Sequence, residues 1–369
     1  MASRTTPSRA RAAASEQPRA RVRDHAGRGA RVELDFDART AYDFVVSLMV
    51  IPGTDAELLP EDLAWLERVR KDLPKDLLDA FDECFGENAL GAFGGISSII
   101  VESPHIRAAA GFGAAVDRLS DEELSRYIVR DVLCYAGADA LADSVLQGDT
   151  TAIAEAHALL DERQGLVLDT FLGNVGGQVG QLRRAIAGWL PLYQEIEPRV
   201  EQMIERDVAA RRAERETLDP VALIERTTGG LRWLPETSAR RVIMAPTYFG
   251  RPYNHIFQGS DWRLFAYPLA EEALGPTDAS VPPQAAVRLY RALGDQTRMR
   301  VLRLLSERDW YLTELAQQLE LSKPTMKHHL ALLRAAGLVT VTDQGSMTYY
   351  SLRRERVRDA GLELQHYLG

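Results

Sequence analysis

The stretch "LSKPTMKHHLALLRAAGLV" (Leu321–Val339) most constrains the fold, because it carries signals for both ends of one short helix. Ser322 can cap the N-terminus by accepting a free main-chain amide. Pro324 follows in the first turn, where a helix loses no internal hydrogen bond to proline. Gly337 ends the helix, since glycine readily takes the backbone conformation that closes a helix. These signals predict a helix of about three turns.

The predicted helix has two different faces. A buried stripe is formed by residues spaced four and three apart, namely Met326, Leu330 and Leu333. The other faces carry polar and basic side chains, namely Lys323, Thr325, Lys327, His328 and Arg334. A preceding helix, "ELAQQLE", and a short turn complete a helix-turn-helix, whose second helix fits the major groove of DNA. Leu338–Leu352 then predicts a hairpin, and a helix-turn-helix followed by a hairpin is a winged helix.

The charge of the chain is divided in a way that supports this interpretation. The net charge of −9 argues against nucleic-acid binding when it is taken over the whole sequence. However, residues 284–369 hold 13 basic and nine acidic residues, whereas residues 32–283 hold 23 basic and 42 acidic residues. The basic C-terminal block therefore indicates contact with nucleic acid.

The motif "ALGDQTRMRVLRLL…LTELAQQLELSKPTMKHHLALLRAAGLVTV…GSMTYYSL" resembles the ArsR/SmtB winged-helix repressors over about residues 285–352. The resemblance implies a homodimer that places its second helix in the major groove of an inverted-repeat operator on double-stranded DNA. His329 and Leu330 match the conserved His-Leu pair of the family, and Lys327 and His328 match its groove-facing positions. The predicted DNA-binding residues are Ser322, Lys323, Thr325, Lys327, His328, His329 and Arg334.

The sequence departs from the metal sites of that family. Many members bind metal through a cysteine-containing motif on the helix that here is "YLTELAQQL", which contains no cysteine. A second family site uses Asp and His pairs on the C-terminal helix, where only Asp359 and His366 are present, too few for a four-ligand zinc shell. The sequence therefore predicts no metal site and no cofactor.

The region before the winged helix is predicted to be mostly helical. "VELDFD" (Val32–Asp37) alternates like a short strand. Helical patterns follow at 38–50, 60–71, 74–85, 121–146, 151–161, 166–190 and 192–215. In "GNVGGQVG", Gly173, Gly177 and Gly180 fall on one helical face, which indicates close helix packing, since a phosphate-loop lysine is missing.

The segment Trp233–Tyr267 is rich in short apolar runs bounded by proline and glycine, which predicts strands. It holds eight of the 27 aromatic residues of the chain. One interpretation is a β-rich core. The other is a pocket for an organic effector, with the candidate residues Trp233, Tyr248, Tyr253 and Trp262.

These patterns predict a mainly α fold with small β parts, in which a C-terminal winged helix follows a larger helical domain that ends in a β-rich segment. The predicted division is a disordered Arg-rich tail, a sensing or dimerisation domain, a linker and a DNA-binding domain, at residues 1–31, 32–270, 271–283 and 284–369. The expected function is a homodimeric one-component repressor that responds to an organic effector. An enzyme with a DNA-binding appendage and a protein-recruiting winged helix are the alternatives.

The expected location is the cytoplasm, without a membrane partner. The two cysteines, Cys84 and Cys134, have no metal-ligand spacing and indicate no disulfide framework. The longest uncharged apolar run is too short to span a bilayer. No nucleophile–base or metal motif was found, so the sequence predicts that the protein is not an enzyme.

Overall fold

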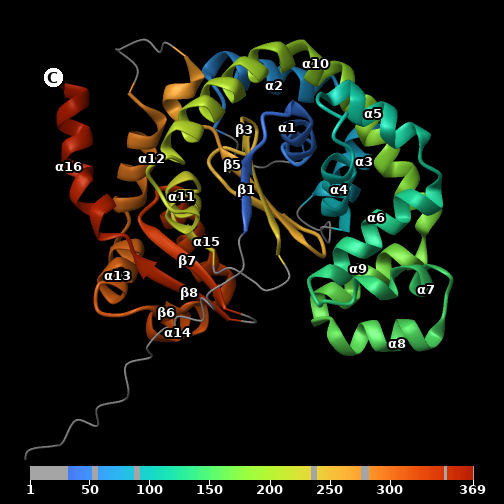
Figure 1. Ribbon diagram of the computed structural model, residues 1–369. Coiled ribbons are helices and arrows are strands. Elements are labelled where there is room, and N and C mark those ends of the chain that lie inside the picture. Colours follow the sequence, from blue (N-terminus) through green and yellow to red (C-terminus); the bar gives the residue numbers. More distant parts are fainter. Residues whose placement is uncertain are drawn as a thin grey trace, which may run out of the picture.

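The computed structural model describes residues 32–51, 57–86, 92–233, 239–275, 282–344 and 347–368. A twisted sheet lies at the centre, with a long helix arching over it and a group of helices on one side (Figure 1). The winged helix, in orange and red, lies on the other side. The predicted tail at residues 1–31 lies outside the described residues, as do residues 276–281 of the predicted linker. Among the described helices, none is long and apolar enough to cross a membrane.

The central sheet has the strand order β1-β3-β5-β4. Its strands are β1 (Glu33–Phe36), β3 (Arg241–Thr247), β4 (His255–Gln258) and β5 (Trp262–Pro268). β1, β3 and β5 are parallel, and β4 runs antiparallel to β5. β3 and β5 are buried almost throughout, as is typical of parallel strands that are covered on both faces. The predicted strand at Val32–Asp37 and the β-rich segment are confirmed.

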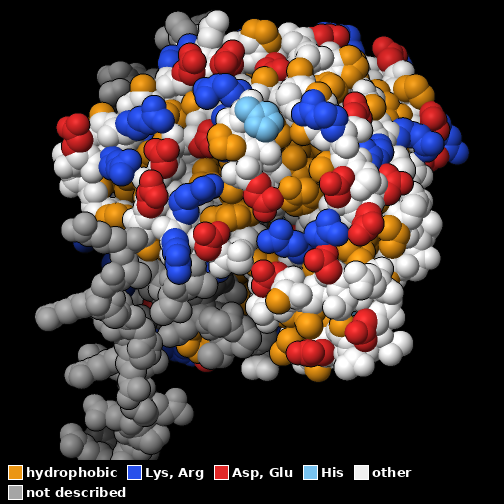
Figure 2. Space-filling model, turned by 45° about the vertical axis from the view of Figure 1, so that its right-hand side comes forward, with side chains coloured by type: hydrophobic (Ala, Val, Ile, Leu, Met, Phe, Trp, Pro, Cys, Tyr) orange, Lys and Arg blue, Asp and Glu red, His pale blue; other side chains and the backbone are white. Residues whose placement is uncertain are grey.

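Helices make up most of the region before the winged helix, which confirms the predicted fold class. They are α1 (Thr40–Ser47), α2 (Pro60–Asp72), α3 (Lys75–Phe85), α4 (Ser97–Glu102), α5 (Ala109–Arg118), α6 (Asp121–Cys134), α7 (Ala142–Leu146), α8 (Thr150–Leu159), α9 (Glu162–Gly173), α10 (Val175–Glu214) and α11 (Pro220–Thr227). Short 3-10 turns occur at Ala92–Ile96, Asp139–Leu141 and Glu271–Leu274. Acidic and basic side chains are interspersed over the face shown in Figure 2, as on an ordinary solvated surface.

Three local predictions in this region are wrong. The helix expected at 121–146 ends at Cys134, because Gly137 takes a φ of +68° that no right-handed helix allows. The helix expected at 166–190 is divided at Asn174 between α9 and α10, and α10 then continues through Pro191 into the segment expected to be a separate helix at 192–215. Gly173 and Gly180 have no packed neighbour within 4 Å, and Gly177 meets only Asn174, which caps its own helix.

Helix α10 continues through Pro191 and Pro198 because its buried side supplies tertiary packing. A proline inside a helix removes one main-chain hydrogen bond and normally bends or ends it. Here an apolar stripe along the helix is fully buried between the sheet and the flanking helices: Leu182, Trp189, Tyr193, Val200 and Ile204. The free energy of burying this stripe offsets the lost hydrogen bonds.

A buried carboxylate connects the first helix to the sheet. Asp43 of α1 accepts hydrogen bonds from the main-chain amides of Tyr248 (2.7 Å) and Phe249 (2.9 Å), just after β3. It also accepts one from the hydroxyl of Tyr193 in α10, at 2.8 Å. Burial raises the pKa of Asp43 from its ordinary value of 3.8 to about 7.

The C-terminal region is a winged helix, as predicted. Its elements are α12 (Gln284–Leu293), α13 (Gln296–Leu305), β6 (Trp310–Tyr311), α14 (Leu312–Gln318), α15 (Lys323–Ala335), β7 (Val339–Gln344), β8 (Met347–Leu352) and α16 (Arg354–Leu368). α14 and α15 form the helix-turn-helix, and β7 and β8 form the wing. The winged helix has its own buried core, which includes Met326, Leu330 and Leu333.

The sheet of the wing receives a fourth strand from the N-terminal region. β2 (Leu231–Arg232) pairs in parallel with β7, which gives the order β2-β7-β8-β6. The amide of Val341 donates to the carbonyl of Gly230 at 3.0 Å. Arg353 reinforces the pair, because its Nη1 donates to the carbonyls of Gly229 (2.7 Å) and Gly337 (3.1 Å). The sequence did not predict this pairing, since β2 is only two residues long.

We expect Asp43→Asn to remove a pH-dependent contribution to stability. Between its ordinary pKa and about pH 7, the folded protein holds a proton on Asp43 that the unfolded chain has released. The contribution is therefore complete in acid and is lost as the pH rises through about 7. Relative to the variant, the free energy of unfolding of the wild type should fall by about 1 kcal/mol per pH unit over this interval. Urea denaturation of both proteins from pH 5 to 8 measures this difference. If the unfolding free energies of the wild type and the variant change with pH in the same way, Asp43 does not have the raised pKa.

We expect Gly230→Ala to weaken the pairing between β2 and β7. Gly230 has a φ of +121°, and an added Cβ would lie 3.0 Å from the carbonyl oxygen of Val339. Gly148→Ala is the matched control, because Gly148 also has a positive φ (+78°) but has no neighbour within 4 Å. Gly230→Ala should lose about 1–3 kcal/mol of unfolding free energy in urea, and more than the control loses. If the two variants lose the same unfolding free energy, the contact of Gly230 with the wing contributes nothing to stability.

Candidate functional site

The N-terminus of α15 is built as the sequence predicts. The side-chain oxygen of Ser322 accepts a hydrogen bond from the amide of Thr325 at 3.2 Å, and Pro324 lies in the first turn. The buried stripe of α15 packs on the core of the winged helix. At the other end Gly337 has a φ of +70° and turns the chain into β7. The outward face of α15 is therefore fixed by its caps and by its buried stripe.

The structure divides the seven predicted DNA-binding residues into two groups. The first group is exposed along the N-terminal half of α15 and consists of Ser322, Lys323, Thr325, Lys327 and His328. His329 is only 15% exposed and has its Nδ1 3.9 Å from the carboxylate of Asp295, which caps α13. Arg334 is half-buried and faces the N-terminal region. The exposed group can reach DNA without a rearrangement, and its contact with DNA remains a prediction.

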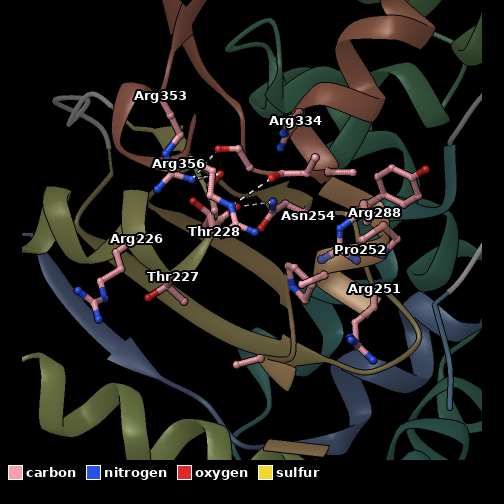
Figure 3. Close-up of a pocket in the computed structure, with 18 of the residues that line it drawn as sticks. Arg226, Thr227, Thr228, Arg251, Pro252, Asn254, Arg288, Arg334, Arg353 and Arg356 are labelled. Atoms are coloured by element: carbon pink, nitrogen blue, oxygen red, sulfur yellow. Dashed lines mark hydrogen bonds between the residues drawn. The ribbon is translucent and has the colours of Figure 1, made fainter. Parts of the chain in front are cut away.

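A cavity of about 470 Å³ lies between the winged helix and the N-terminal region (Figure 3). We call it the interdomain cavity. One wall comes from α11, the loop after it and the β3–β4 loop, and the other comes from α12, α15 and the start of α16. Eight basic side chains line it, against only two acidic ones, Glu271 and Glu272. The basic residues are Arg211, Arg226, Arg251, Arg288, Lys327, Arg334, Arg353 and Arg356.

Several of these arginines lose solvation and repel one another. Burial lowers the pKa of Arg251, and burial together with the charge of Arg356 lowers the pKa of Arg288 to about 10. Burial and then the charge of Arg353 lower the pKa of Arg356. The pKa of His255, on β4 beside the cavity, falls to about 4 because of burial and the charge of Arg334. The cavity therefore has a positive potential that disfavours further cations.

Part of the charge is balanced within the protein. Arg251 donates to the carbonyl of Glu57 at 3.0 Å and lies 3.7 Å from the carboxylate of Glu271. Arg288 forms an ion pair with the carboxylate of Glu57. The ion pair of Arg288 joins α12 to the N-terminal region.

Several polar atoms at the interdomain cavity are buried without a hydrogen-bond partner. They are Thr227 Oγ1, Asn254 Oδ1 and Arg288 Nε, and Arg211 Nε is a fourth such atom. The other end of the Asn254 amide is engaged, because Nδ2 donates to the carbonyl of Thr228 at 2.8 Å. Buried polar groups normally have partners, so these atoms indicate a site that is completed by a ligand or by water.

The structure does not bring the four predicted effector residues together. Tyr248 is fully buried, and its hydroxyl donates to Asp62 at 2.5 Å and accepts from the amide of Leu59 at 2.7 Å. Trp233 and Trp262 are 8% and 6% exposed and belong to two different buried clusters. Only Tyr253 lines the interdomain cavity. The four residues therefore do not form one aromatic pocket, because the fold uses Trp233, Tyr248 and Trp262 as buried core.

Sequence reasoning missed the arginines of the interdomain cavity. They come from six separate segments, and no local motif unites them. The only available signal was the density of arginine in the C-terminal block, which we attributed to DNA. Among the described residues, no group of three or more His, Cys, Asp or Glu side chains is arranged to hold a metal ion.

The fold and the exposed basic half of α15 define a winged helix-turn-helix DNA-binding domain. A helix-turn-helix domain family matches residues 293–342. The chain is 38% identical over 84 residues to the HTH-type transcriptional regulator KmtR of Mycobacterium tuberculosis, and the match covers 22% of this chain and 65% of KmtR.

Two further relatives match the same region. The transcriptional repressor SdpR of Bacillus subtilis is 32% identical over 72 residues, which is 20% of this chain and 80% of SdpR. The transcriptional activator HlyU of Vibrio cholerae is 35% identical over 83 residues, which is 22% of this chain and 76% of HlyU. The chain therefore belongs to the ArsR/SmtB family of helix-turn-helix regulators through its C-terminal domain. These matches leave the large N-terminal region unassigned.

Proposed function

We propose that the protein is a one-component transcription regulator, a homodimeric repressor that binds an inverted-repeat operator through α15 and responds to an organic effector. The observation that carries the proposal is the exposed N-terminal half of α15, where Lys323, Lys327 and His328 extend from a winged-helix core. The major groove admits a helix, and the N-terminus of a helix favours the negative charge of phosphate.

The N-terminal region is the proposed sensor. Its β2 strand and its contacts with α12 join it to the winged helix, so a change within it can alter the position of α15. An organic effector is favoured over a metal by the cavity, which is lined by arginine rather than by metal ligands. Among the relatives the sign of regulation differs, since SdpR is named a repressor and HlyU an activator. Repression is proposed because a dimer that covers its operator blocks polymerase without a further partner.

We expect Lys327→Ala and Lys323→Ala to weaken binding to the upstream region of the protein's own gene. In the proposal both lysines supply phosphate or base-edge contacts, and Lys323 neutralises one phosphate. Loss of the Lys323 charge should therefore reduce the slope of log affinity against log salt by about one unit. Gel shifts at several salt concentrations measure both effects.

The controls are Lys71→Ala and Lys75→Ala, which remove exposed lysines of α2 and α3, outside the winged helix. They should leave affinity and slope unchanged. If all four variants bind alike, α15 is not the DNA-binding helix. If the wild type retains no DNA at low salt, the winged helix recruits a protein instead.

The DNA-bound form should be a two-fold symmetric dimer. One helix-turn-helix contacts only a few base pairs, whereas two related by symmetry contact half-sites about 34–36 Å apart. Footprinting should therefore show two protected half-sites with inverted sequence, and the mass of the complex should correspond to two chains. A single half-site bound by one chain would rule out the dimer.

A further inference from the structure

The interdomain cavity has the features of a binding site for a small anion. Arg334, Arg353 and Arg356 converge on it from the winged helix, facing Thr228 and Asn254 of the N-terminal region (Figure 3). The two acidic residues of the cavity offset only part of this charge. Glu271 already accepts from the amide of Ala285 and faces Arg251, and Glu272 is exposed to solvent.

Clustering buried guanidinium groups costs free energy, which a bound anion would recover. Burial lowers the pKa of Arg288, Arg353 and Arg356, and the charge of a neighbouring arginine lowers it further for Arg288 and Arg356. Guanidinium groups bind carboxylates and phosphates through paired, charge-assisted hydrogen bonds. The cluster therefore selects a ligand with negatively charged oxygen atoms.

The other residues of the cavity wall indicate which further groups the ligand carries. Thr227 is 5% exposed, and its unpartnered hydroxyl can donate to an oxygen atom, while Asn254 Oδ1 can accept from a ligand hydroxyl. Pro252, Leu269 and Leu330 add apolar surface. A volume of about 470 Å³ is within the usual range for pockets that bind small molecules.

We propose that the interdomain cavity binds a small organic anion with at least two negative charges, carried by carboxylate or phosphate groups. The proposal rests on the proposed role of the N-terminal region as the sensor and supplies the chemistry of its effector. A ligand in the cavity contacts Arg334 of α15 and Thr227 of α11 together. It therefore joins the DNA-binding helix to the sensor and fixes their relative position.

The inward-facing side of α15 explains why the ligand is a small molecule rather than DNA. Lys323, Thr325 and His328 are exposed to solvent, whereas Leu330 and Arg334 line a space whose opposite wall is the N-terminal region. Duplex DNA at the exposed side of the helix contacts the first set and leaves the cavity to a smaller ligand.

Calorimetry on the full chain without DNA tests the proposal. The probes are inorganic pyrophosphate and citrate, titrated against sodium chloride of equal ionic strength as the control. We expect saturable binding of at least one probe, and the tighter of the two identifies phosphate or carboxylate as the preferred group. Arg356→Gln should weaken that binding about tenfold or more, because it removes a charge-assisted contact.

Arg358→Gln is the matched control, since Arg358 lies two residues further along α16, is exposed and is not part of the cavity wall. It should bind the probe as the wild type does. Thr227→Val provides a second variant that keeps the side-chain shape, and it should weaken binding while the protein remains folded.

Two outcomes would overturn the proposal. One is that neither probe binds, or that Arg356→Gln and Arg358→Gln bind alike. The other is that Arg356→Gln lowers only the affinity for operator DNA and its salt slope, which would assign these arginines to the phosphate backbone. Since the calorimetry contains no DNA, anion binding can succeed while operator binding fails, and the two proposals are judged separately.

Discussion

The pairing of β2 with β7 is the interaction on which the arrangement of the molecule depends. β2 belongs by packing to the N-terminal region, where Leu231 is part of a buried cluster with β1 and β3. By hydrogen bonding it belongs to the wing, as the parallel partner of β7. The side chain of Leu231 thus lies in the core of the N-terminal region, while the main chain of the same strand pairs with the sheet of the winged helix. Arg353 spans the junction by donating to a carbonyl on each side.

This junction gives α15 two separate environments. Its exposed N-terminal half carries the lysines proposed to contact DNA, and its C-terminal half, together with Lys327, forms a wall of the interdomain cavity. The same rigid helix therefore faces the proposed operator and the proposed effector. A ligand that favours one position of α15 changes DNA affinity by as much as its affinities for the two positions differ. No long pathway is needed, since both sites share one helix.

The winged helix could be predicted because its signals are local. Ser322, Pro324 and Gly337 determine the ends of α15, and the spacing of Met326, Leu330 and Leu333 determines its buried side. The N-terminal region was predicted less well where tertiary packing overrides local signals. Pro191 would end most helices, but the burial of Trp189 and Tyr193 keeps α10 continuous.

The candidate effector site could not be predicted for a related reason. Composition drew attention to the aromatic residues between Trp233 and Tyr267, which the fold uses mainly as core. The residues that line the interdomain cavity come from segments that meet only after two sheets have formed and β2 has joined the wing. Neither the two-residue strand nor the convergence of Arg334 and Arg356 leaves a periodic pattern in the sequence.

Amide hydrogen exchange tests the coupling between the two halves most directly. The account predicts that the amides of Leu231–Arg232 and of Val339–Thr342 are protected with similar opening free energies. It also predicts that the protection of both strands changes together when operator DNA is added. If β7 is protected while β2 exchanges like an unpaired segment, with and without DNA, the winged helix is an independent domain and the account is contradicted.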